Sequence, residues 1–203
     1  MLSPSILSRP VYPGLRVDKF ARLNLILAEG DGAEAVLALS QTPDATCAFF
    51  ARSLIFHCAV NAAERAILPA LEALAPQALW SFPSAETTLV RLRGVLQTAT
   101  MGTRILAAGT EPFIGQVVAE AAVFGVDPRS IITEHRGSTR RRVQCVHCKG
   151  MIENVTQNPV VCSHCGLSLF VRDHYSKRLG AFQGVCIDAE APGHIPAAEE
   201  LYP

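Results

Sequence analysis

The chain has 203 residues, of which 49% are hydrophobic and 18% are charged, so a disordered chain is excluded. Its Lys and Arg total 18 and its Asp and Glu total 18, so net charge points neither to nucleic acid nor to an anionic membrane. Because no apolar run approaches the roughly 20 residues that span a bilayer, and the Pro-rich beginning does not resemble a signal peptide, we expect a cytoplasmic protein.

Short apolar runs alternate with Ala- and Leu-rich stretches after a Pro-rich N-terminal arm, which we place at residues 1–20. The predicted strands are 25–28, 53–58, 79–82, 103–108 and 130–134. The predicted helices are 33–39, 61–74 with Asn61 as its N-cap, 89–98 and 113–124. Strands separated by helices imply parallel β-α-β units. Residues 21–135 are therefore expected to form a three-layer α/β domain with a parallel sheet of about four or five strands.

The composition changes at residues 136–142 (RGSTRRR), which are typical of a basic linker, either a solvated hinge or a contact for an acidic partner. Residues 143–186 then carry two Cys-x-x-Cys pairs and are expected to form a small four-cysteine metal module of the zinc-ribbon or rubredoxin-like kind. The remaining tail, 187–203, is rich in Pro and Ala and is expected to lie extended over another part of the protein.

Four cysteines of this module have the spacing of a metal site, namely Cys145, Cys148, Cys162 and Cys165. Each Cys-x-x-Cys pair forms a turn with both sulfurs on one side, and two facing turns give a tetrahedral S₄ set. Such a set suits Zn²⁺ or a single Fe ion, and spacing does not separate the two. Gly150 and Gly166 follow the turns and are expected to let the backbone curl toward the sulfurs.

Three further residues near these turns could also bind metal, but the sequence gives only weak indications for them. His147 and His164 lie inside the two turns and are expected to face solvent rather than bind metal. Cys186 is either a fifth sulfur near the site or a small buried hydrophobic residue, and we expect the latter. The module has too few residues to form a hydrophobic core of its own, so we expect metal binding to supply most of its folding free energy.

A possible phosphate loop precedes the first predicted helix, where residues 30–35 (GDGAEA) match G-x-G-x-x-A. Glu29, Asp31 and Glu34 place negative charge where a pyrophosphate would lie, so a plain strand-to-helix turn is favoured. No Ser/His/Asp set, H-E-x-x-H or G-K-[ST] motif occurs. We therefore assign no catalytic residue and no cofactor-binding residue.

The α/β segment resembles the pyridine-nucleotide domain of the ferredoxin-reductase family, above all in RILAAGTEPFIGQVVAEAAVFGVDPRSIITE. The resemblance covers about 110 residues, from Leu25 to Glu134. It departs from the family at the Gly-rich loop and at Ala108, where the family places a cysteine beside the nicotinamide. Because only about 20 residues precede this segment in the sequence, we expect no flavin-binding barrel before it. The resemblance thus implies a reductase-like fold that has lost NAD(P)H and flavin binding.

Residues 143–193 resemble the small DmmA-type subunit of dimethylamine monooxygenase, in RDHYS and in RLGAFQGVC. This resemblance implies a non-catalytic accessory subunit of an oxidoreductase complex that converts dimethylamine, O₂ and NADPH to methylamine and formaldehyde. It implies partner subunits that carry haem, flavin (FMN), [2Fe–2S] and NADPH. Within the complex this chain would be a scaffold, or an electron relay if its metal is iron.

Two other functions compete with this interpretation. One is a stand-alone electron-transfer protein, with iron in a rubredoxin-like cysteine site. The other is a zinc-ribbon nucleic-acid binder, indicated by the basic residues at 140–142 and Lys149, which zero net charge and sparse aromatic residues argue against. We therefore expect protein partners and neither a nucleic acid nor a membrane.

Overall fold

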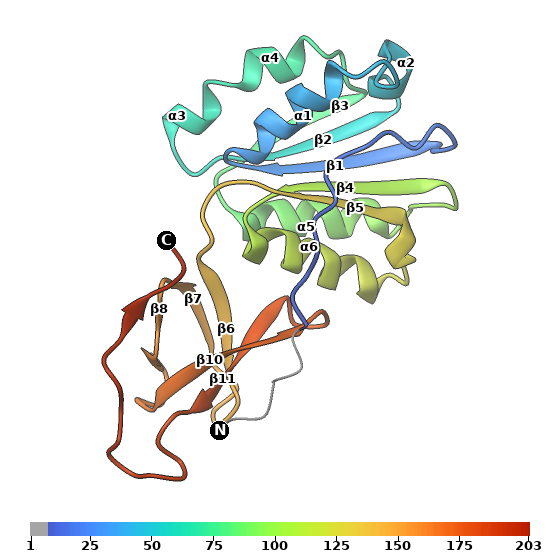
Figure 1. The fold of residues 1–203 in the computed structure, drawn as a ribbon. Helices are drawn as coiled ribbons and strands as arrows, with labels where there is room; N and C mark the ends of the chain where they lie inside the picture. The colour runs from blue at the N-terminus through green and yellow to red at the C-terminus, as the bar shows by residue number, and fades with distance from the viewer. Residues whose placement is uncertain (1–7) are drawn as a thin grey trace. The chain divides into compact units, whose positions relative to one another are not determined.

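The computed structural model describes residues 8–203, and these form two compact units (Figure 1). One unit is residues 12–137; the other is residues 138–203 together with residues 8–11. Residues 1–7 of the expected N-terminal arm lie outside the described part. Among the described residues, no helix is both long and apolar enough to cross a membrane.

The first unit is built on a parallel sheet of five strands, as the alternation of apolar runs and helices predicts. Its strands are β1 (Leu23–Glu29), β2 (Ser53–Cys58), β3 (Ala78–Phe82), β4 (Thr103–Gly109) and β5 (Ile131–His135). Their order across the sheet is β3-β2-β1-β4-β5. The order reverses between β1 and β4, where ligands of such sheets usually bind, beyond the carboxyl ends of the strands.

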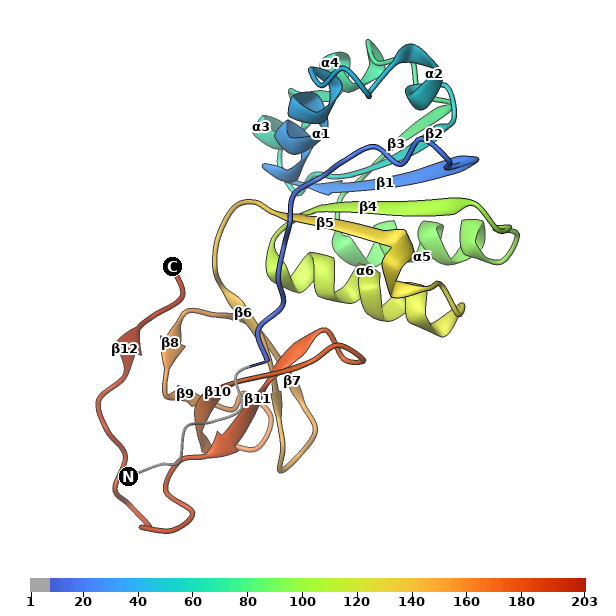
Figure 2. The ribbon, with the colours of Figure 1, turned by 45° about the vertical axis from the view of Figure 1, so that its right-hand side comes forward.

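Helices cover both faces of this sheet, so the predicted three-layer α/β architecture is confirmed (Figures 1 and 2). The helices are α1 (Gly32–Ser40), α2 (Cys47–Phe50), α3 (Ala62–Arg65), α4 (Leu68–Glu72), α5 (Ala85–Leu96) and α6 (Glu111–Val123), with a 3₁₀ turn η1 at Pro128–Ser130. Successive strand residues point to opposite faces. Leu25 and Leu27 therefore pack with α5 and α6, whereas Ile26 and Ala28 pack with α1, α2 and α4.

Two predicted helices differ from the observed ones. Asn61 caps a helix as predicted, because its side chain accepts a hydrogen bond from Glu64 N, but the stretch 61–74 contains two short helices, α3 and α4. Helix α5 begins earlier than predicted, at Ala85, where the Ser84 side chain accepts from Thr87 N. Local capping chemistry, rather than the apolar pattern, therefore sets where α5 begins.

The second unit is a small β structure that carries the cysteine pairs. Its strands are β6 (Arg141–Cys145), β7 (Met151–Val155), β8 (Gln157–Asn158), β9 (Val160–Val161), β10 (Ser168–Ser176), β11 (Ala181–Cys186) and β12 (Glu199–Glu200). Five of them form a sheet of order β7-β6-β11-β10-β9, and β12 pairs with β8. The tail is thus held against the unit by a strand pair and by the buried side chain of Tyr202.

This unit has a hydrophobic core of its own, contrary to the expectation from its length. The core consists of Val143, Cys145, Ile152, Val155, Cys162, Leu169, Val171, Phe182 and Tyr202. Arg141 extends this core, since its guanidinium lies 3.9 Å from the ring centroid of Phe182 and 4.0 Å from that of Tyr202. The same guanidinium donates to Asp173, so a buried charge is paired inside the unit.

Candidate metal centre

Two similar turns present the four cysteines at one end of the second unit. In the first turn, which follows β6, Lys149 N donates to Cys145 O and Cys145 N donates to Gly150 O. In the second turn, Gly166 N donates to Cys162 O and Cys162 N donates to Leu167 O. Each turn therefore closes on its first cysteine, which aims both sulfurs of a pair to the same side.

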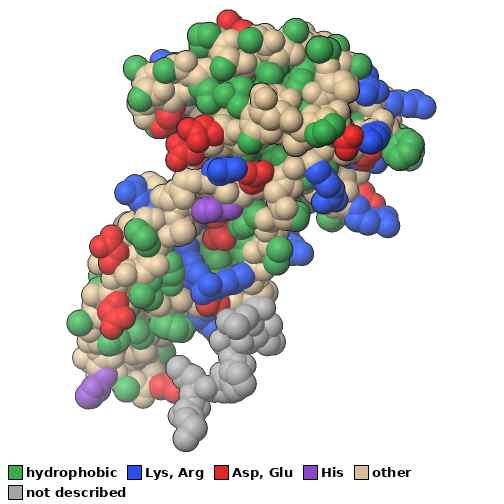
Figure 3. Space-filling view, turned by 45° about the horizontal axis from the view of Figure 1, so that its top comes forward, with side chains coloured by type: hydrophobic (Ala, Val, Ile, Leu, Met, Phe, Trp, Pro, Cys, Tyr) green, Lys and Arg blue, Asp and Glu red, His purple; other side chains and the backbone are tan. Residues whose placement is uncertain are grey.

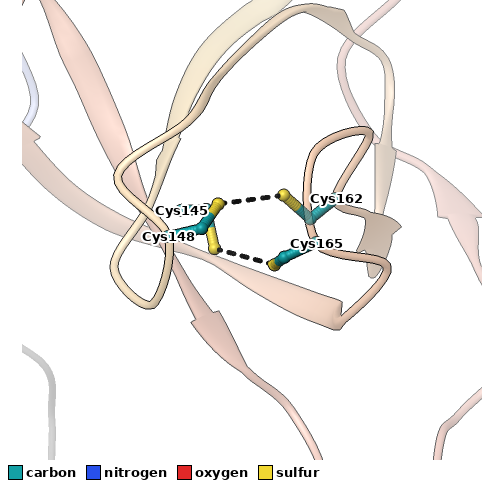
Figure 4. Close-up of side chains that lie close together, drawn as sticks. All are labelled: Cys145, Cys148, Cys162 and Cys165. Carbon is teal, nitrogen blue, oxygen red and sulfur yellow. Dashed lines mark hydrogen bonds between the residues drawn. The ribbon is translucent and has the colours of Figure 1, made fainter.

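The four sulfur atoms lie together as the spacing predicts, all within 4.8 Å of one another (Figure 4). Cys145 Sγ lies 3.8 Å from Cys165 Sγ, and Cys148 Sγ lies 3.7 Å from Cys162 Sγ. These separations are far beyond a disulfide bond of about 2.05 Å. They match the edge of about 3.8 Å that a tetrahedron with metal–sulfur bonds of about 2.3 Å would have. The donor set therefore fits a Zn²⁺ or Fe ion.

The pKa values of the clustered thiols also favour a bound cation. Burial raises the pKa of the Cys162 thiol, but the backbone N–H groups of Cys165 and His164 outweigh it and bring the pKa to about 6. The backbone N–H of Leu167 lowers the pKa of Cys165, but burial and the hydrogen bonds with neighbouring thiols raise it to about 12. Four adjacent sulfurs cannot all be ionised without a cation, and a divalent metal removes this conflict.

The two glycines after the turns have different roles. Gly166 has φ +76°, so it adopts the left-handed conformation that the turn needs, as expected. In the first turn this conformation falls on Lys149, with φ +65°, and not on Gly150. Gly150 is required for space instead, because a Cβ atom there would lie 2.4 Å from the His164 ring.

His164 connects the two turns through a contact that the sequence does not predict. Both His147 and His164 are exposed, as predicted. The His164 ring nevertheless crosses to the first turn, where its Nε2 donates to Met151 O at 2.8 Å. Spacing alone gives no signal for this contact, because it joins residues of two different turns.

Cys186 is not the buried hydrophobic residue that we expected. Its side chain is partly exposed, and its Sγ donates to Asp188 Oδ1 at 3.2 Å. This hydrogen bond, together with partial burial, raises the pKa of the Cys186 thiol. Cys186 thus stays outside the four-sulfur group among the described residues.

The edge where β1 and β4 end, which we call the β1–β4 edge, is the other candidate site, and the carboxylate of Glu29 lies there. Glu29 Oε2 accepts hydrogen bonds from Thr110 N and from Thr110 Oγ1, at the first turn of α6. Gly32 packs so closely on β4 that a Cβ atom there would lie 2.2 Å from Ala108 O. A carboxylate of the chain itself therefore lies at the N-terminus of α6, a position that favours an anion.

Two profiles of one protein family match this chain. The N-terminal domain of the dimethylamine monooxygenase subunit DmmA-like family matches residues 4–131, and its C-terminal domain matches residues 142–185. The chain belongs to the DmmA-like family. The resemblance that the sequence indicated is thereby confirmed, over both units of the structure.

A curated relative of this DmmA-like chain is the heme-dependent oxidative N-demethylase delta subunit of Ectopseudomonas mendocina (strain ymp). It is 36% identical over 115 residues, which cover 57% of this chain and 66% of the relative, slightly less than two thirds.

Among solved structures, phthalate dioxygenase reductase is similar, with 14% identity, a TM-score of 0.43, and coverage of 72% of this chain and 47% of that one. An intact type IV self-sufficient cytochrome P450 monooxygenase has 16% identity, a TM-score of 0.49, and coverage of 84% and 26%. At such identities the likeness concerns the fold alone.

Proposed function

We propose that this DmmA-like chain is a non-catalytic accessory subunit of a haem-dependent dimethylamine monooxygenase. The complex would convert dimethylamine, O₂, NADPH and a proton to methylamine, formaldehyde, NADP⁺ and water. The observation that carries the proposal is the family match over both units, joined by a relative that is a subunit of a haem-dependent N-demethylase. Haem would belong to a catalytic partner, and FMN with [2Fe–2S] to a reductase partner.

The β1–β4 edge supports the assignment of NADPH to a partner rather than to this chain. Glu29 places a negative charge at the start of α6, where it would repel a pyrophosphate. Gly32, the first residue of α1, packs directly on Ala108 of β4. This close packing reduces the space for a ligand between α1 and the end of β4. We therefore expect no saturable NADPH binding by the isolated chain, as measured by titration calorimetry.

The cysteine group supports a role in holding the second unit together. Cys145, Cys148, Cys162 and Cys165 would hold one Zn²⁺, which supplies no redox chemistry and acts as a structural clip. Two of these ligands, Cys145 and Cys162, are also core residues, so metal binding and folding are coupled. A single Fe ion in the same thiolates is the alternative, and it would supply one-electron chemistry instead.

The decisive experiment compares the haem and reductase partner subunits, expressed with and without this chain. We expect full NADPH-dependent dimethylamine oxidation only with the chain present, and none from the chain alone.

Metal analysis and an absorption spectrum of the purified chain distinguish the two metals. One zinc per chain without visible bands supports a scaffold, whereas one iron with thiolate charge-transfer bands supports the stand-alone electron-transfer protein or a relay within the complex. Turnover of dimethylamine by the chain alone would contradict the proposal.

A further inference from the structure

Two large apolar side chains stand almost fully exposed at the amino end of the first unit's sheet. Phe20 is 90% exposed and Met101 is 92% exposed. They lie on the loops that lead into β1 and β4, and these loops are joined, since Arg22 N donates to Gly102 O at 2.8 Å. The strands that follow are paired through Leu23 and Thr103, so the two loops are neighbours in space.

The loop that carries Phe20 is fixed by polar contacts beneath the exposed side chain. The Asp18 carboxylate accepts from Phe20 N at 2.9 Å and is paired with Arg104. Ala21, the residue after Phe20, is only 1% exposed and anchors the turn in the unit. A rigid loop loses little conformational entropy when it binds, so exposed apolar side chains on it are suited to a docking role.

Two arginines flank the apolar pair without an acidic partner among residues 8–203. Arg52 Nη1 donates to Ala21 O at 3.0 Å, which holds its guanidinium beside the loop that carries Phe20. The stem of Arg22 lies over Gly102, next to Met101: a Cβ atom built there would be 3.1 Å from Arg22 Cγ. The nearby carboxylates are already committed, Asp18 to Arg104 and Asp44 to Lys19. The patch therefore carries uncompensated positive charge.

We infer that these four residues, which we call the Phe20–Met101 patch, bind an acidic surface of a partner subunit that has an apolar socket. Phe, Met and Arg are the residue types enriched at protein–protein interfaces. Neither guanidinium is neutralised by a carboxylate among the described residues, so a partner's carboxylates are their natural complement, although Arg52 already donates to the backbone oxygens of Ala48 and Ala21. Figure 3 shows exposed hydrophobic side chains next to Lys, Arg, Asp and Glu side chains on the surface of this unit.

The inference rests on the proposed function, since it requires that the chain assembles with the haem and reductase subunits. It adds which face of the first unit is used: the amino edge of the sheet, opposite to the β1–β4 edge that carries Glu29. An apolar pair of this kind can contribute a large share of an interface's binding energy when it enters a pocket.

The test measures binding of the purified full chain to each immobilised partner subunit. The variants are Phe20→Ser with Met101→Ser, and Arg22→Glu alone. The matched control is Val90→Ser with Val123→Ser, which removes apolar side chains that are 58% and 79% exposed on α5 and α6. We expect each patch variant to weaken binding to one subunit about thirtyfold or more, and the control to change it less than about threefold. Higher salt should weaken wild-type binding and should affect Arg22→Glu less.

Three results would overturn the inference. If wild type binds a subunit and the patch variants bind it equally well, the patch is not the docking site, although the proposed function stands. If wild type binds neither subunit, the proposed function fails and the inference fails with it. If the patch variants instead abolish self-association of the isolated chain, the occupant is a second copy. Circular dichroism of every variant checks that these exposed substitutions leave the fold intact.

Discussion

Gly150 shows how the absence of a side chain positions the two cysteine turns. The His164 ring occupies the space of a Cβ atom at this position and donates to Met151 O. We expect Gly150→Ala to displace the ring, to break this hydrogen bond and to destabilise the second unit by about 1–3 kcal/mol. Loss of metal to a competing chelator should become faster, as measured by metal release.

The control for Gly150→Ala is Gly94→Ala in helix α5. No atom lies within 4 Å of a Cβ atom placed at Gly94, so alanine fits there and favours the helix. Metal release should be unchanged in this variant. Equal metal release from Gly150→Ala and wild type would show that the contact between the turns does not matter for the metal.

His57 makes the first unit sensitive to acid. His57 is 0% exposed, and neither nitrogen of its ring has a hydrogen-bond partner among the described residues. Burial lowers the pKa of His57 below its ordinary value of 6.5, although the nearby Glu64 carboxylate opposes the shift. The unfolded chain therefore binds this proton more readily than the folded one. Stability is fully present above about pH 6.5 and falls as the pH drops through and below that value.

The variant His57→Leu should remove this part of the pH dependence, because an apolar side chain fits the apolar surroundings without a proton to gain. Urea unfolding at pH 7.5 and pH 5, followed by fluorescence of the single Trp80 on β3, reports the first unit alone. The loss of stability between the two pH values should shrink in His57→Leu and persist in His194→Leu, whose side chain is exposed. An unchanged loss in His57→Leu would assign the acid sensitivity to other groups.

At the scale of elements, the first turn of helix α6 is capped by the Glu29 carboxylate of strand β1. Its cap residue Thr110 makes no side-chain cap bond within the helix, and Glu29 of β1 accepts from both its N–H and its hydroxyl group. Burial raises the pKa of Glu29 above its ordinary value of 4.5, more than the Thr110 hydrogen bonds lower it. The stability from protonated Glu29 is therefore present below pH 4.5 and is lost as the pH rises through the folded pKa.

Replacement of Glu29 separates its charge from its hydrogen bonds. Glu29→Gln keeps an acceptor for Thr110 without the buried charge, so at pH 7 it should be at least as stable as wild type. Glu29→Ala leaves the two Thr110 donors unsatisfied and should cost about 1–3 kcal/mol. Urea unfolding followed by Trp80 fluorescence measures both. A Glu29→Gln variant as unstable as Glu29→Ala would show that the carboxylate charge itself holds α6.

The sequence predicts those elements whose pattern is local. Buried strands such as β1 and β4 are apolar runs, and the Cys-x-x-Cys turns are complete within a few residues. The stretch 61–74 was wrongly predicted as one helix, because its apolar composition hides the break before α4. Contacts across elements were missed for a different reason. The pairs Glu29–Thr110 and Gly150–His164 exist only once distant segments meet, so neither spacing nor propensity records them.

Arg141 of the second unit is another residue whose environment depends on contacts between distant segments. By composition it belongs to a basic stretch that is typical of a solvated linker. In the structure it lies in β6, is 6% exposed, and is paired with Asp173 between two aromatic rings. Its partners are far along the chain, so only the folded sheet shows that this charge is part of a core.

At the scale of the whole molecule, the two units should respond differently to metal removal. The first unit has two hydrophobic clusters on the faces of a parallel sheet, and it contains none of the four clustered cysteines. The second unit has a smaller core, in which Cys145 and Cys162 are themselves buried. Loss of the metal would leave four adjacent thiols that repel one another once ionised, so this unit should unfold.

We therefore expect an excess of a strong chelator to unfold residues 138–203 while residues 12–137 stay folded. Limited proteolysis should then cut the second unit, and Trp80 fluorescence, which reports the first unit, should stay native. Cys162→Ser should behave like chelated wild type without any chelator, whereas Cys47→Ser, at an exposed cysteine of α2, should keep its metal and resist cleavage. If the chelated second unit resisted the protease, its own apolar core, with Arg141 clamped between Phe182 and Tyr202, would suffice for folding. The metal would then serve a chemical role rather than a stabilising one, which favours iron over zinc in the four thiolates.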